Sequence, residues 1–384
     1  MQTIAHLDLD AFFCAVEELY TPALRGVPFA VGGTPDGRGV VASCSYPARM
    51  QGVHSAMPMG QALRICPNLQ VISHRRGAYT QASRKVMEKI RQITPLVEQI
   101  SIDEAFFDLS NQADAERIAR DLQLDIFNTL RLPSSIGIAA NKLVAKIAND
   151  YGKSLKRDGT PPRAFTVVPT GEEATFLAPL PVKKLWGVGP KTEERLAALG
   201  IRTIGDLANQ DELKMLQRFG QVGYEITRRA RGIDKRPIVT EREAKSISQE
   251  TTFSKDTRDK RELQRVLRKL SHKVCERLQR KNLVARTVKI KIRWSDFTTL
   301  TRQTTLQTHT NESDVFIHAA EKLFNEHWQG RPLRLIGMGV SGLEKSQQQI
   351  GLWDHDWEKE RHVEDALAEI QKKFGDSAIK RGAK

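Results

Sequence analysis

Short apolar runs alternate with amphipathic stretches through the first 150 residues, and this alternation limits the fold more than any other feature of the chain. The short runs are typical of strands, whereas residues 79–93 place apolar side chains at helical spacing. The mixture predicts an α+β domain with helices on one face of a mainly antiparallel sheet. The expected strands are 3–8, 29–32, 40–43, 70–73, 97–109 (two strands with a bend at residues 103–104) and 134–139, and the expected helices are 79–93, 113–130 and 142–150.

The remainder of the chain falls into segments of different pattern. Because 384 residues exceed the size at which one core keeps growing, we expect two or more domains. Residues 152–163 form a polar, turn-rich connector, residues 181–232 have a helical pattern, and residues 241–345 return to mixed helix and strand. A tail follows, in which residues 357–374 have the pattern of an amphipathic helix.

The charge of the chain favours a polyanionic partner. Lys and Arg number 60 against 46 Asp and Glu, a formal net charge of +14, and residues 241–345 alone carry 22 basic against 13 acidic residues. Nucleic acid is the first candidate partner and an anionic membrane surface the second. No apolar segment is long enough to span a bilayer, and residues 1–3 lack the character of a signal peptide, so we expect a cytoplasmic protein without a membrane partner. The four cysteines form no Cys-x-x-Cys pair and are expected to be reduced thiols.

Three acidic residues have the character of a divalent-metal site. Asp8 ends the apolar run at 4–8, and Asp103 and Glu104 are adjacent at the bend of residues 97–109. A carboxylate carried into a packed region needs a cation, and Mg²⁺ prefers carboxylate oxygens together with substrate phosphates. Two such ions about 3.5–4 Å apart stabilise both oxygens of a phosphoryl transfer. Taken alone, the same residues also fit a solvated turn.

A glycine hairpin opens a helix at residues 185–200. Gly187 and Gly189 precede Pro190 and Lys191, and such a turn presents backbone N–H groups and a helix N-terminus to a phosphate. The pattern is similar to the helix-hairpin-helix motif, which contacts the DNA backbone without reading sequence. The alternative is an ordinary helical turn.

The segment 288–294 alternates strictly between apolar and basic residues. In a strand, Lys289, Lys291 and Arg293 would share one face while the apolar residues face a core. The basic row fits a DNA backbone, although a solvated outer strand has the same pattern.

Two aromatic sites near the acids leave alternatives open. If a helix starts at Tyr46, then Arg49 shares its face and the pair can hold a triphosphate. Taken locally, ordinary surface packing of the two side chains is the favoured explanation. Phe12 and Phe13 follow the first acid, and by default they are core residues; one ring is also suited to excluding a ribose 2′-hydroxyl.

Five ordered motifs resemble the Y-family translesion DNA polymerases, in the branch of bacterial DNA polymerase IV. The resemblance covers residues 1 to about 345, and its motifs are Asp8-Leu9-Asp10-Ala11-Phe12-Phe13-Cys14-Ala15-Val16-Glu17, Ser45-Tyr46-Pro47-Ala48-Arg49, Ser101-Ile102-Asp103-Glu104-Ala105, Lys142-Leu143-Val144-Ala145-Lys146-Ile147-Ala148 and the glycine hairpin.

The resemblance implies an α+β multidomain fold, a right-hand polymerase. Its parts would be a catalytic palm, small fingers, a helical thumb with the helix-hairpin-helix motif, and an α/β little finger that binds DNA. The implied boundaries are 1–10 and 76–166 for the palm, 11–75 for the fingers, 167–234 for the thumb, 235–241 for a linker, 242–345 for the little finger and 346–384 for a tail.

The resemblance also implies roles for individual residues. Asp8 and Asp103 would bridge two Mg²⁺ ions (or Mn²⁺), with Glu104 on the ion nearer the primer and the carbonyl of Leu9 on the other. Tyr46, Arg49 and Lys153 would hold the incoming deoxynucleoside triphosphate. Phe13, beside Phe12, would be the steric gate against ribonucleotides. The residues after Lys153 depart from the family's short Pro-Asn-Gly turn, which makes Lys156 an alternative to Lys153.

The implied function is low-fidelity, template-directed DNA synthesis on a primer, without a proofreading exonuclease, in DNA damage tolerance. Its partners would be primer-template DNA, deoxynucleoside triphosphates and a sliding clamp, with the chain a monomer. The clamp-binding peptide would be residues 349–353, through Gln349, Ile350, Leu352 and Trp353.

Two other functions remain open on sequence alone. A nucleotidyl cyclase also uses paired carboxylates and two metals, but needs neither a phosphate-gripping hairpin nor a basic C-terminal domain. A non-catalytic DNA-binding protein is the second alternative, and it has no need for all three acids.

Overall fold

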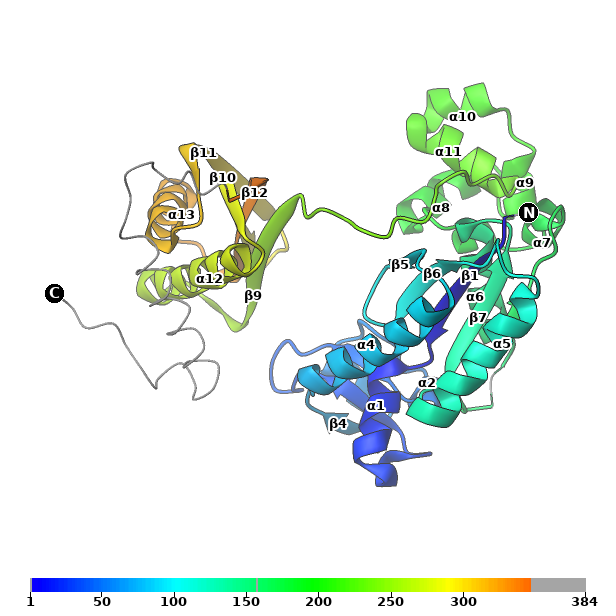
Figure 1. Cartoon of the computed structure of the whole chain (residues 1–384). Coiled ribbons are helices and arrows are strands. Elements are labelled where there is room, and N and C mark those ends of the chain that lie inside the picture. Colours follow the sequence, from blue (N-terminus) through cyan, green and yellow to red (C-terminus); the bar gives the residue numbers. More distant parts are fainter. Residues whose placement is uncertain (1, 157, 347–384) are drawn as a thin grey trace, which may run out of the picture. The chain divides into compact units, whose positions relative to one another are not determined.

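The computed structural model describes residues 2–156 and 158–346, which form two compact units. Among the described residues, the first unit comprises those up to Glu243 together with Thr252–Lys255, and the second comprises Ala244–Thr251 and those from Asp256 to Ser346. Figure 1 shows the elements of each. The expected clamp peptide at 349–353 and the expected helix at 357–374 lie outside the described residues, so both stay predictions.

A five-stranded sheet forms the centre of the first unit. Its order is β5-β6-β1-β7-β8, and β1 pairs antiparallel with β6 and with β7, while β7 and β8 are parallel. The strands predicted from the apolar runs and the bend between the two strands of 97–109 are confirmed. The bounds are β1 (Ile4–Leu9), β5 (Val97–Gln99), β6 (Glu104–Asp108), β7 (Ser134–Ala139) and β8 (Phe165–Val167).

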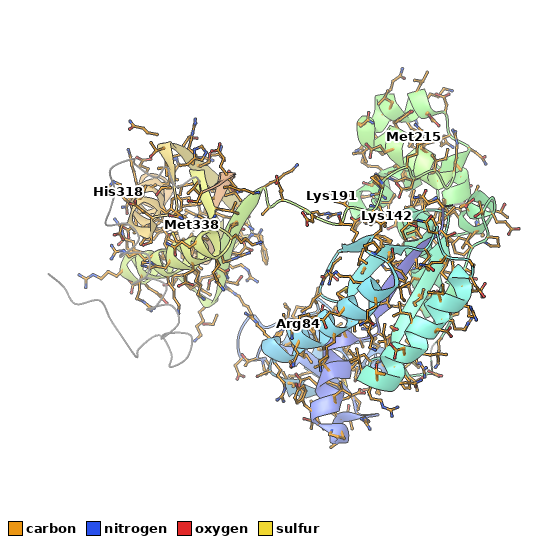
Figure 2. The ribbon with its side chains drawn as sticks, viewed as in Figure 1. Arg84, Lys142, Lys191, Met215, His318 and Met338 are labelled. Atoms are coloured by element: carbon orange, nitrogen blue, oxygen red, sulfur yellow. The ribbon has the colours of Figure 1, made fainter. Side chains whose placement is uncertain are left out.

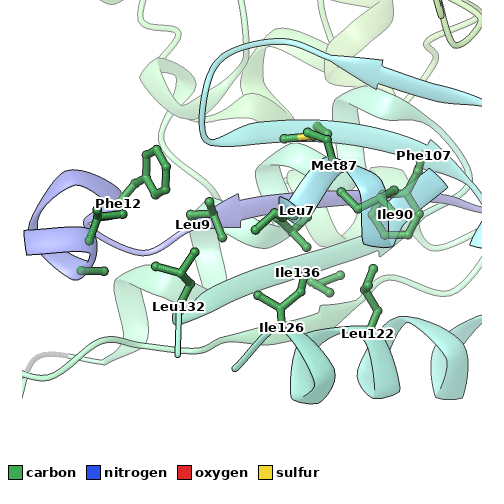
Figure 3. Close-up of a cluster of buried hydrophobic side chains, with 14 of the residues drawn as sticks. Leu7, Leu9, Phe12, Met87, Ile90, Phe107, Leu122, Ile126, Leu132 and Ile136 are labelled. Atoms are coloured by element: carbon green, nitrogen blue, oxygen red, sulfur yellow. The ribbon is translucent and has the colours of Figure 1, made fainter. Parts of the chain in front are cut away.

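Helices cover both faces of this sheet, so the expectation of helices on one face is wrong. Helices α4 (Arg76–Ile93) and α5 (Ala115–Asp125) pack against the face that carries Leu7 and Leu9, in the core drawn in Figure 3. The opposite face packs against α6 (Lys142–Leu155). The physical reason is visible in β1, where successive residues point to opposite faces and nearly all are buried.

Helix α6 also runs past the predicted end at residue 150, so the predicted connector 152–163 begins inside a helix. Gly152 was expected to start a turn. Instead it allows close packing, because a Cβ at this position would lie 2.2 Å from Oγ1 of Thr166 in β8. The glycine marks a helix–strand contact.

A smaller sheet and short helices complete the part of the unit that borders the site. Strands β3, β2 and β4 form a sheet in that order, with β2 and β3 antiparallel and β2 and β4 parallel. The bounds are α1 (Phe12–Tyr20), β2 (Phe29–Gly32), β3 (Val41–Cys44), α2 (Tyr46–Met50), α3 (Met59–Ile65) and β4 (Gln70–Ile72). All four cysteines are buried and free, as expected.

The predicted helical segment at 181–232 is confirmed. It contains the short turn η3 (Val182–Lys184) and α8 (Pro190–Ala197), α9 (Ile204–Ala208), α10 (Glu212–Phe219) and α11 (Gln221–Ala230), preceded by α7 (Glu173–Leu177). These helices enclose the core of Leu196, Ile204, Leu207 and Ile226.

In its described residues, the second unit is a four-stranded sheet with two helices. The strand order is β11-β10-β12-β9, and apolar residues of α12, α13 and the sheet form its buried interior, with Met338 among them (Figure 2). The bounds are β9 (Ser246–Thr257), α12 (Lys260–Arg280), β10 (Leu283–Trp294), β11 (Thr299–Thr310), α13 (Ser313–His327) and β12 (Leu333–Lys345). Within the described residues, no helix is long and apolar enough to cross a membrane.

Candidate active site

One stripe of α6 places a polar side chain over the central sheet at each turn. The four residues are spaced by four, three and four positions, so they share one face of the helix. Each of them reaches a polar side chain of the sheet. The pairs, in chain order along α6, are Lys142 with Glu98 (2.7 Å), Lys146 with Glu104 (3.0 Å), Asn149 with His6 (3.0 Å) and Lys153 with Asp8 (2.6 Å).

Asp8 lies at the end of β1 on the face that packs against α6. Its backbone is paired opposite Glu104 of β6, which brings two of the predicted acids onto neighbouring strands. Burial raises the pKa of Asp8 to about 7, against the effect of the Lys153 ammonium, and the charges of Glu104 and Asp103 raise it further. The chain thus holds a buried carboxylate whose negative charge one lysine does not fully compensate.

Glu104 is turned toward α6. Its Oε2 accepts a hydrogen bond from Lys146 at 3.0 Å and lies 3.7 Å from Nε2 of His6. His6 and Lys146 hold the pKa of Glu104 below its usual range. Burial lowers the pKa of His6, so its ring is neutral at pH 7.

Asp103 sits on the bend between β5 and β6. The hydroxyl of Ser101 donates to its Oδ1 at 2.5 Å and accepts hydrogen bonds from the N–H groups of Asp103 and Glu104. The N–H of Leu9 donates to the carbonyl of Asp103, which fixes the end of β1 against the bend. The bend allows adjacent acids to point in different directions, and Asp103 borders the same cavity as Asp8.

A cavity of about 200 Å³ lies beside these acids, and it brings together most of the predicted site. Its lining comprises Asp8, Leu9, Ala11, Phe12, Phe13, Ala42, Ser43, Tyr46, Arg49, Ser55, Asp103 and Lys153. Ala11 has a left-handed backbone (φ 46°) between β1 and α1. This turn places the two aromatic residues at the start of α1 beside the cavity.

Tyr46 and Arg49 share a face of α2, as the helical interpretation predicted. Ser45 caps the helix by accepting from the N–H of Ala48, and the Arg49 guanidinium lies 4.8 Å from the centre of the Tyr46 ring. Burial, with the nearby charge of Asp10, raises the pKa of Tyr46, so its hydroxyl is neutral and able to donate. Both side chains line the cavity.

The two phenylalanines have different environments. Phe12 is 3% exposed and belongs to the core. Phe13 is partly exposed and stacks on Tyr79, with ring centres 4.4 Å apart. Tyr79 is itself fixed, because its hydroxyl donates to Glu17 at 2.6 Å and accepts from the N–H of Arg75. The Phe13 ring therefore has a rigid support on one side.

Lys153 and Lys156 occupy different surroundings. Lys153 contacts Asp8 and also lies 3.3 Å from Asp10, and these two carboxylates raise its pKa although burial acts in the opposite direction. Lys156 is bonded to the carbonyl of Pro161 and paired with Asp158, and it is absent from the cavity lining. The geometry favours Lys153 at the site.

The oxygen donors at the cavity are suited to a hard divalent cation. Asp8 and Asp103 present carboxylates, and an ammonium already lies against Asp8, which shows that the position attracts positive charge. In the described part of the chain, however, no three such side chains are gathered closely enough to enclose an ion, since Glu104 is held by Lys146. A rotation of Glu104 is needed for all three acids to act together.

The expected DNA contacts lie on the elements that the sequence suggested. Gly187 has φ 108°, a conformation that favours glycine, and Gly189 begins α8, with Lys191 in its first turn (Figure 2). On β10, Val288, Ile290 and Ile292 are buried while Lys289, Lys291 and Arg293 are partly exposed. Gly339 and Gly337 of β12 lie opposite Lys289 and Lys291, so no side chain of β12 covers these two lysines, whereas Leu335 lies opposite Arg293. Lys291 pairs with Glu250 of β9 at 2.8 Å.

Sequence reasoning missed several polar residues around the acids. They are His6, Asp10, Ser101, Ser135, Lys146 and Asn149. The spacing of Lys142, Lys146, Asn149 and Lys153 was readable as one helix face. Asp10 is fully buried, and it accepts from the Ser135 hydroxyl at 2.8 Å and the Arg163 N–H at 3.0 Å, a contact across 153 positions that no local pattern signals.

Comparisons with known proteins match nearly the whole chain to one family. The impB/mucB/samB family matches residues 7–150, its C-terminal domain matches 244–352, and the HHH motif of the same family matches 170–201. DNA polymerase IV 1 of Bacillus subtilis (strain 168) is 39% identical over 390 residues, covering 99% of this chain and 92% of the relative. DNA polymerase IV of Opitutus terrae is 38% identical and covers 100% of this chain and 97% of the relative.

Solved structures share the fold. A Y-family DNA polymerase chimera of Dbh and Dpo4 matches with a TM-score of 0.78 at 24% identity, covering 88% of this chain and 98% of the chimera. DinB from Sulfolobus solfataricus matches with a TM-score of 0.61 at 23% identity over the same shares. The chain is 38–39% identical to DNA polymerases IV over nearly its whole length, and it therefore belongs to the Y-family of translesion DNA polymerases, which are DNA-directed DNA polymerases.

Proposed function

We propose that the cavity beside Asp8 and Asp103 is the nucleotide-addition site of this polymerase, and that it uses two Mg²⁺ ions. The observation that carries the proposal is the convergence on one cavity of two acids, two cations and three aromatic rings from separate segments. Asp8, Asp103 and Glu104, with the carbonyl of Leu9, would hold the ions. When bound, such ions neutralise the charge of the reacting phosphate and polarise its oxygens. Mn²⁺ has the same ligand preference and is the alternative ion.

The chain's own residues supply binding and orientation. Tyr46 offers a neutral hydroxyl and Arg49 a guanidinium from one helix face, a pair suited to phosphate oxygens. Lys153 remains charged, and it faces the same cavity. Attack of the primer 3′-oxygen on the α-phosphorus would depend on this positioning and on charge neutralisation.

Phe13 is proposed as the gate against ribonucleotides. Its ring borders the cavity and cannot retreat toward Tyr79, on which it already stacks. A sugar with a 2′-hydroxyl would meet this ring. Phe12, being buried, is assigned to supporting the turn at Ala11.

The remaining proposals concern partners. The hairpin at Gly187, Gly189 and Lys191 and the row Lys289, Lys291 and Arg293 would contact the DNA backbone, and residues 349–353 would bind a sliding clamp. Two solved structures that share this fold are ternary complexes of Dbh, which supports the proposal that this chain binds its substrates in the same fold. The proposed boundaries for palm, fingers, thumb, linker and little finger are those given above. We propose a cytoplasmic monomer.

Primer extension tests the proposal. We expect Mg²⁺-dependent, distributive extension by the wild-type chain and its loss in Asp103→Ala/Glu104→Ala, with DNA binding retained. Glu116→Ala/Asp121→Ala, which removes two exposed acids of α5, is the matched control and should extend as wild type. Undiminished extension by the first variant would remove these acids from the site, and a folded wild type without extension would favour the DNA-binding alternative.

A further inference from the structure

Helix α12 of the second unit carries an excess of positive charge on its solvent side. Residues Lys260–Arg280 contain eight Lys and Arg residues against two Glu. The apolar residues of the helix, among them Leu263, Leu267 and Val274, are buried. The basic residues must therefore gather on the outward face.

The members of this face are exposed and follow one stripe. Arg261, Arg265, Lys269 and Lys273 are all exposed, and they recur every four positions, with Arg268 and His272 beside them. From the first to the last of these four, the helix rises about 18 Å. One strand of DNA places about five phosphates over such a length.

These cations differ from those of helix α5. On α5, Arg117 pairs with Asp114 and Arg120 with Glu116, within one turn of the helix. On α12, Arg268 pairs with Glu321 of α13. Among residues 2–156 and 158–346, no ion pair joins Arg261, Arg265, Lys269 or Lys273 to an acid. Four neighbouring positive charges without acidic partners repel one another. Binding of an anionic partner would reduce this electrostatic repulsion.

The stripe is separate from the basic row of β10. In β10 the residues facing the helices are Val288, Ile290 and Ile292, so Lys289, Lys291 and Arg293 lie on the opposite face of the sheet. A single straight duplex that covers the β10 row cannot lie along the outside of α12. Apart from His272, this face has no aromatic ring for base stacking.

We propose that the outward face of α12 is a second binding surface for the phosphate backbone of DNA, separate from the sheet face. It recognises the backbone without regard to sequence, because its stripe consists of cations, with Glu276 beside them. The surface lets the second unit hold one strand on each of its two sides. The inference does not depend on the proposed active site, because Asp103 and Glu104 lie in the first unit.

The chain itself contains one competitor for this surface. Residues 354–369 carry seven acidic against two basic residues. The last described residue, Ser346, donates its N–H to the carbonyl of Asn282, directly after the end of α12. The tail therefore starts beside the basic helix, and the experiment must separate it from DNA.

Binding stoichiometry tests the proposal on the full chain. With the primer-template site saturated, a labelled single-stranded oligonucleotide is titrated at several salt concentrations. We expect a second equivalent to bind, and the triple variant Arg265→Gln/Lys269→Gln/Lys273→Gln to weaken this step about tenfold and to reduce the magnitude of its log–log salt slope by about 2. All three side chains are exposed, so the variant should fold as wild type, which circular dichroism checks.

Two further variants define the outcome. Arg84→Gln/Lys85→Gln/Arg91→Gln removes the same charge from α4 (Figure 2) and should leave binding of the second equivalent unchanged.

The second variant, Asp354→Asn/Asp356→Asn/Glu358→Gln/Glu360→Gln, removes acids from the tail. If a second equivalent is seen only in this variant and disappears when the α12 substitutions are added, the surface binds phosphate in competition with the tail. Absence of a second equivalent in both the wild type and the tail variant, or equal binding by wild type and the α12 variant, overturns the proposal.

Discussion

The pair Lys142 and Glu98 offers a quantitative test of how the first unit is held together. Lys142, in the first turn of α6 (Figure 2), is 4% exposed and Glu98 is 2% exposed; their Nζ and Oε2 atoms are 2.7 Å apart. Lys142 also donates to the carbonyl of Pro237 at 2.7 Å, and Glu98 accepts from the N–H of Val239. The pair therefore fastens the chain segment that follows α11 to the central sheet and α6.

Substituting Lys142→Met leaves Glu98 buried without its principal partner. Breaking such a pair from one side costs about 3–5 kcal/mol. Because the exposed Arg242 and the N–H of Val239 still contact Glu98, we expect a loss near the lower limit, about 3 kcal/mol, or roughly a hundredfold in the opening equilibrium.

Hydrogen exchange of the α6 amides measures this loss without requiring the two units to unfold together. The exposed control Lys85→Met should change protection little. The double variant Glu98→Leu/Lys142→Met should lose less than the sum of its single variants, because no uncompensated charge remains. Full additivity, or protection in Lys142→Met equal to wild type, would refute the interpretation of a coupled buried pair.

The same pair predicts a dependence on pH. Burial alone raises the pKa of Glu98, but the hydrogen bonds from Lys142 and Val239 outweigh it and the pKa is lowered. A lowered folded-state pKa contributes stability above the unfolded value, about 4.3, and that contribution is lost as the pH falls through the folded value. The difference in opening free energy between wild type and Lys142→Met should therefore be constant from neutral pH down to about pH 5, and it should become smaller below pH 4.

Three further predictions concern the proposed site and its partners. Phe13→Val should raise ribonucleotide insertion at least tenfold while largely sparing deoxynucleotide insertion, and Tyr79→Ala should do so more weakly by removing the support of the Phe13 ring; steady-state insertion ratios measure both, and unchanged ratios would remove Phe13 from the gate role. Lys146→Met should lower the Mg²⁺ concentration for half-maximal extension a few-fold, because Lys146 competes for Glu104; a higher requirement would mean that Lys146 orients the acid instead. Deleting residues 349–353 should abolish stimulation by a sliding clamp and spare basal extension, whereas equal loss of both would indicate a folding defect.

Much of the fold was readable from the sequence because its signals are local. The strands at 29–32 and 134–139 begin and end where the apolar runs do, and the bend between 97 and 109 followed from two adjacent acids that cannot share one strand face. The helix over 113–130 was also expected, although the structure ends α5 at Asp125 and continues in a wider turn to Leu130. Local periodicity carries such information directly.

The parts that the sequence did not predict depend on contacts between distant residues. Whether the second face of the sheet is covered depends on α6. This helix packs against His6, which is 143 positions from its partner Asn149, and against Gly137 of another element, β7. The division between Asp103, at the cavity, and Glu104, at Lys146, likewise depends on partners outside the acidic motif. A motif identifies which residues do the chemistry, but the direction of each carboxylate is set by the cations that pack against it.

The stripe on α6 shows how one helix serves both stability and the site. Lys142 and Lys153 each neutralise a buried acid, but the two acids respond differently when the lysine is lost. Glu98 keeps the N–H of Val239 and the Arg242 guanidinium as partners, so we expect it to stay charged without Lys142 and the fold to lose stability. Asp8 has a pKa raised to about 7 and can take up a proton instead, so the absence of Lys153 is tolerated by the fold. Under the proposed function, the end of α6 nearest the cavity would exchange its ion pair for contacts with a substrate phosphate, while the other end keeps the sheet and the following segment in place.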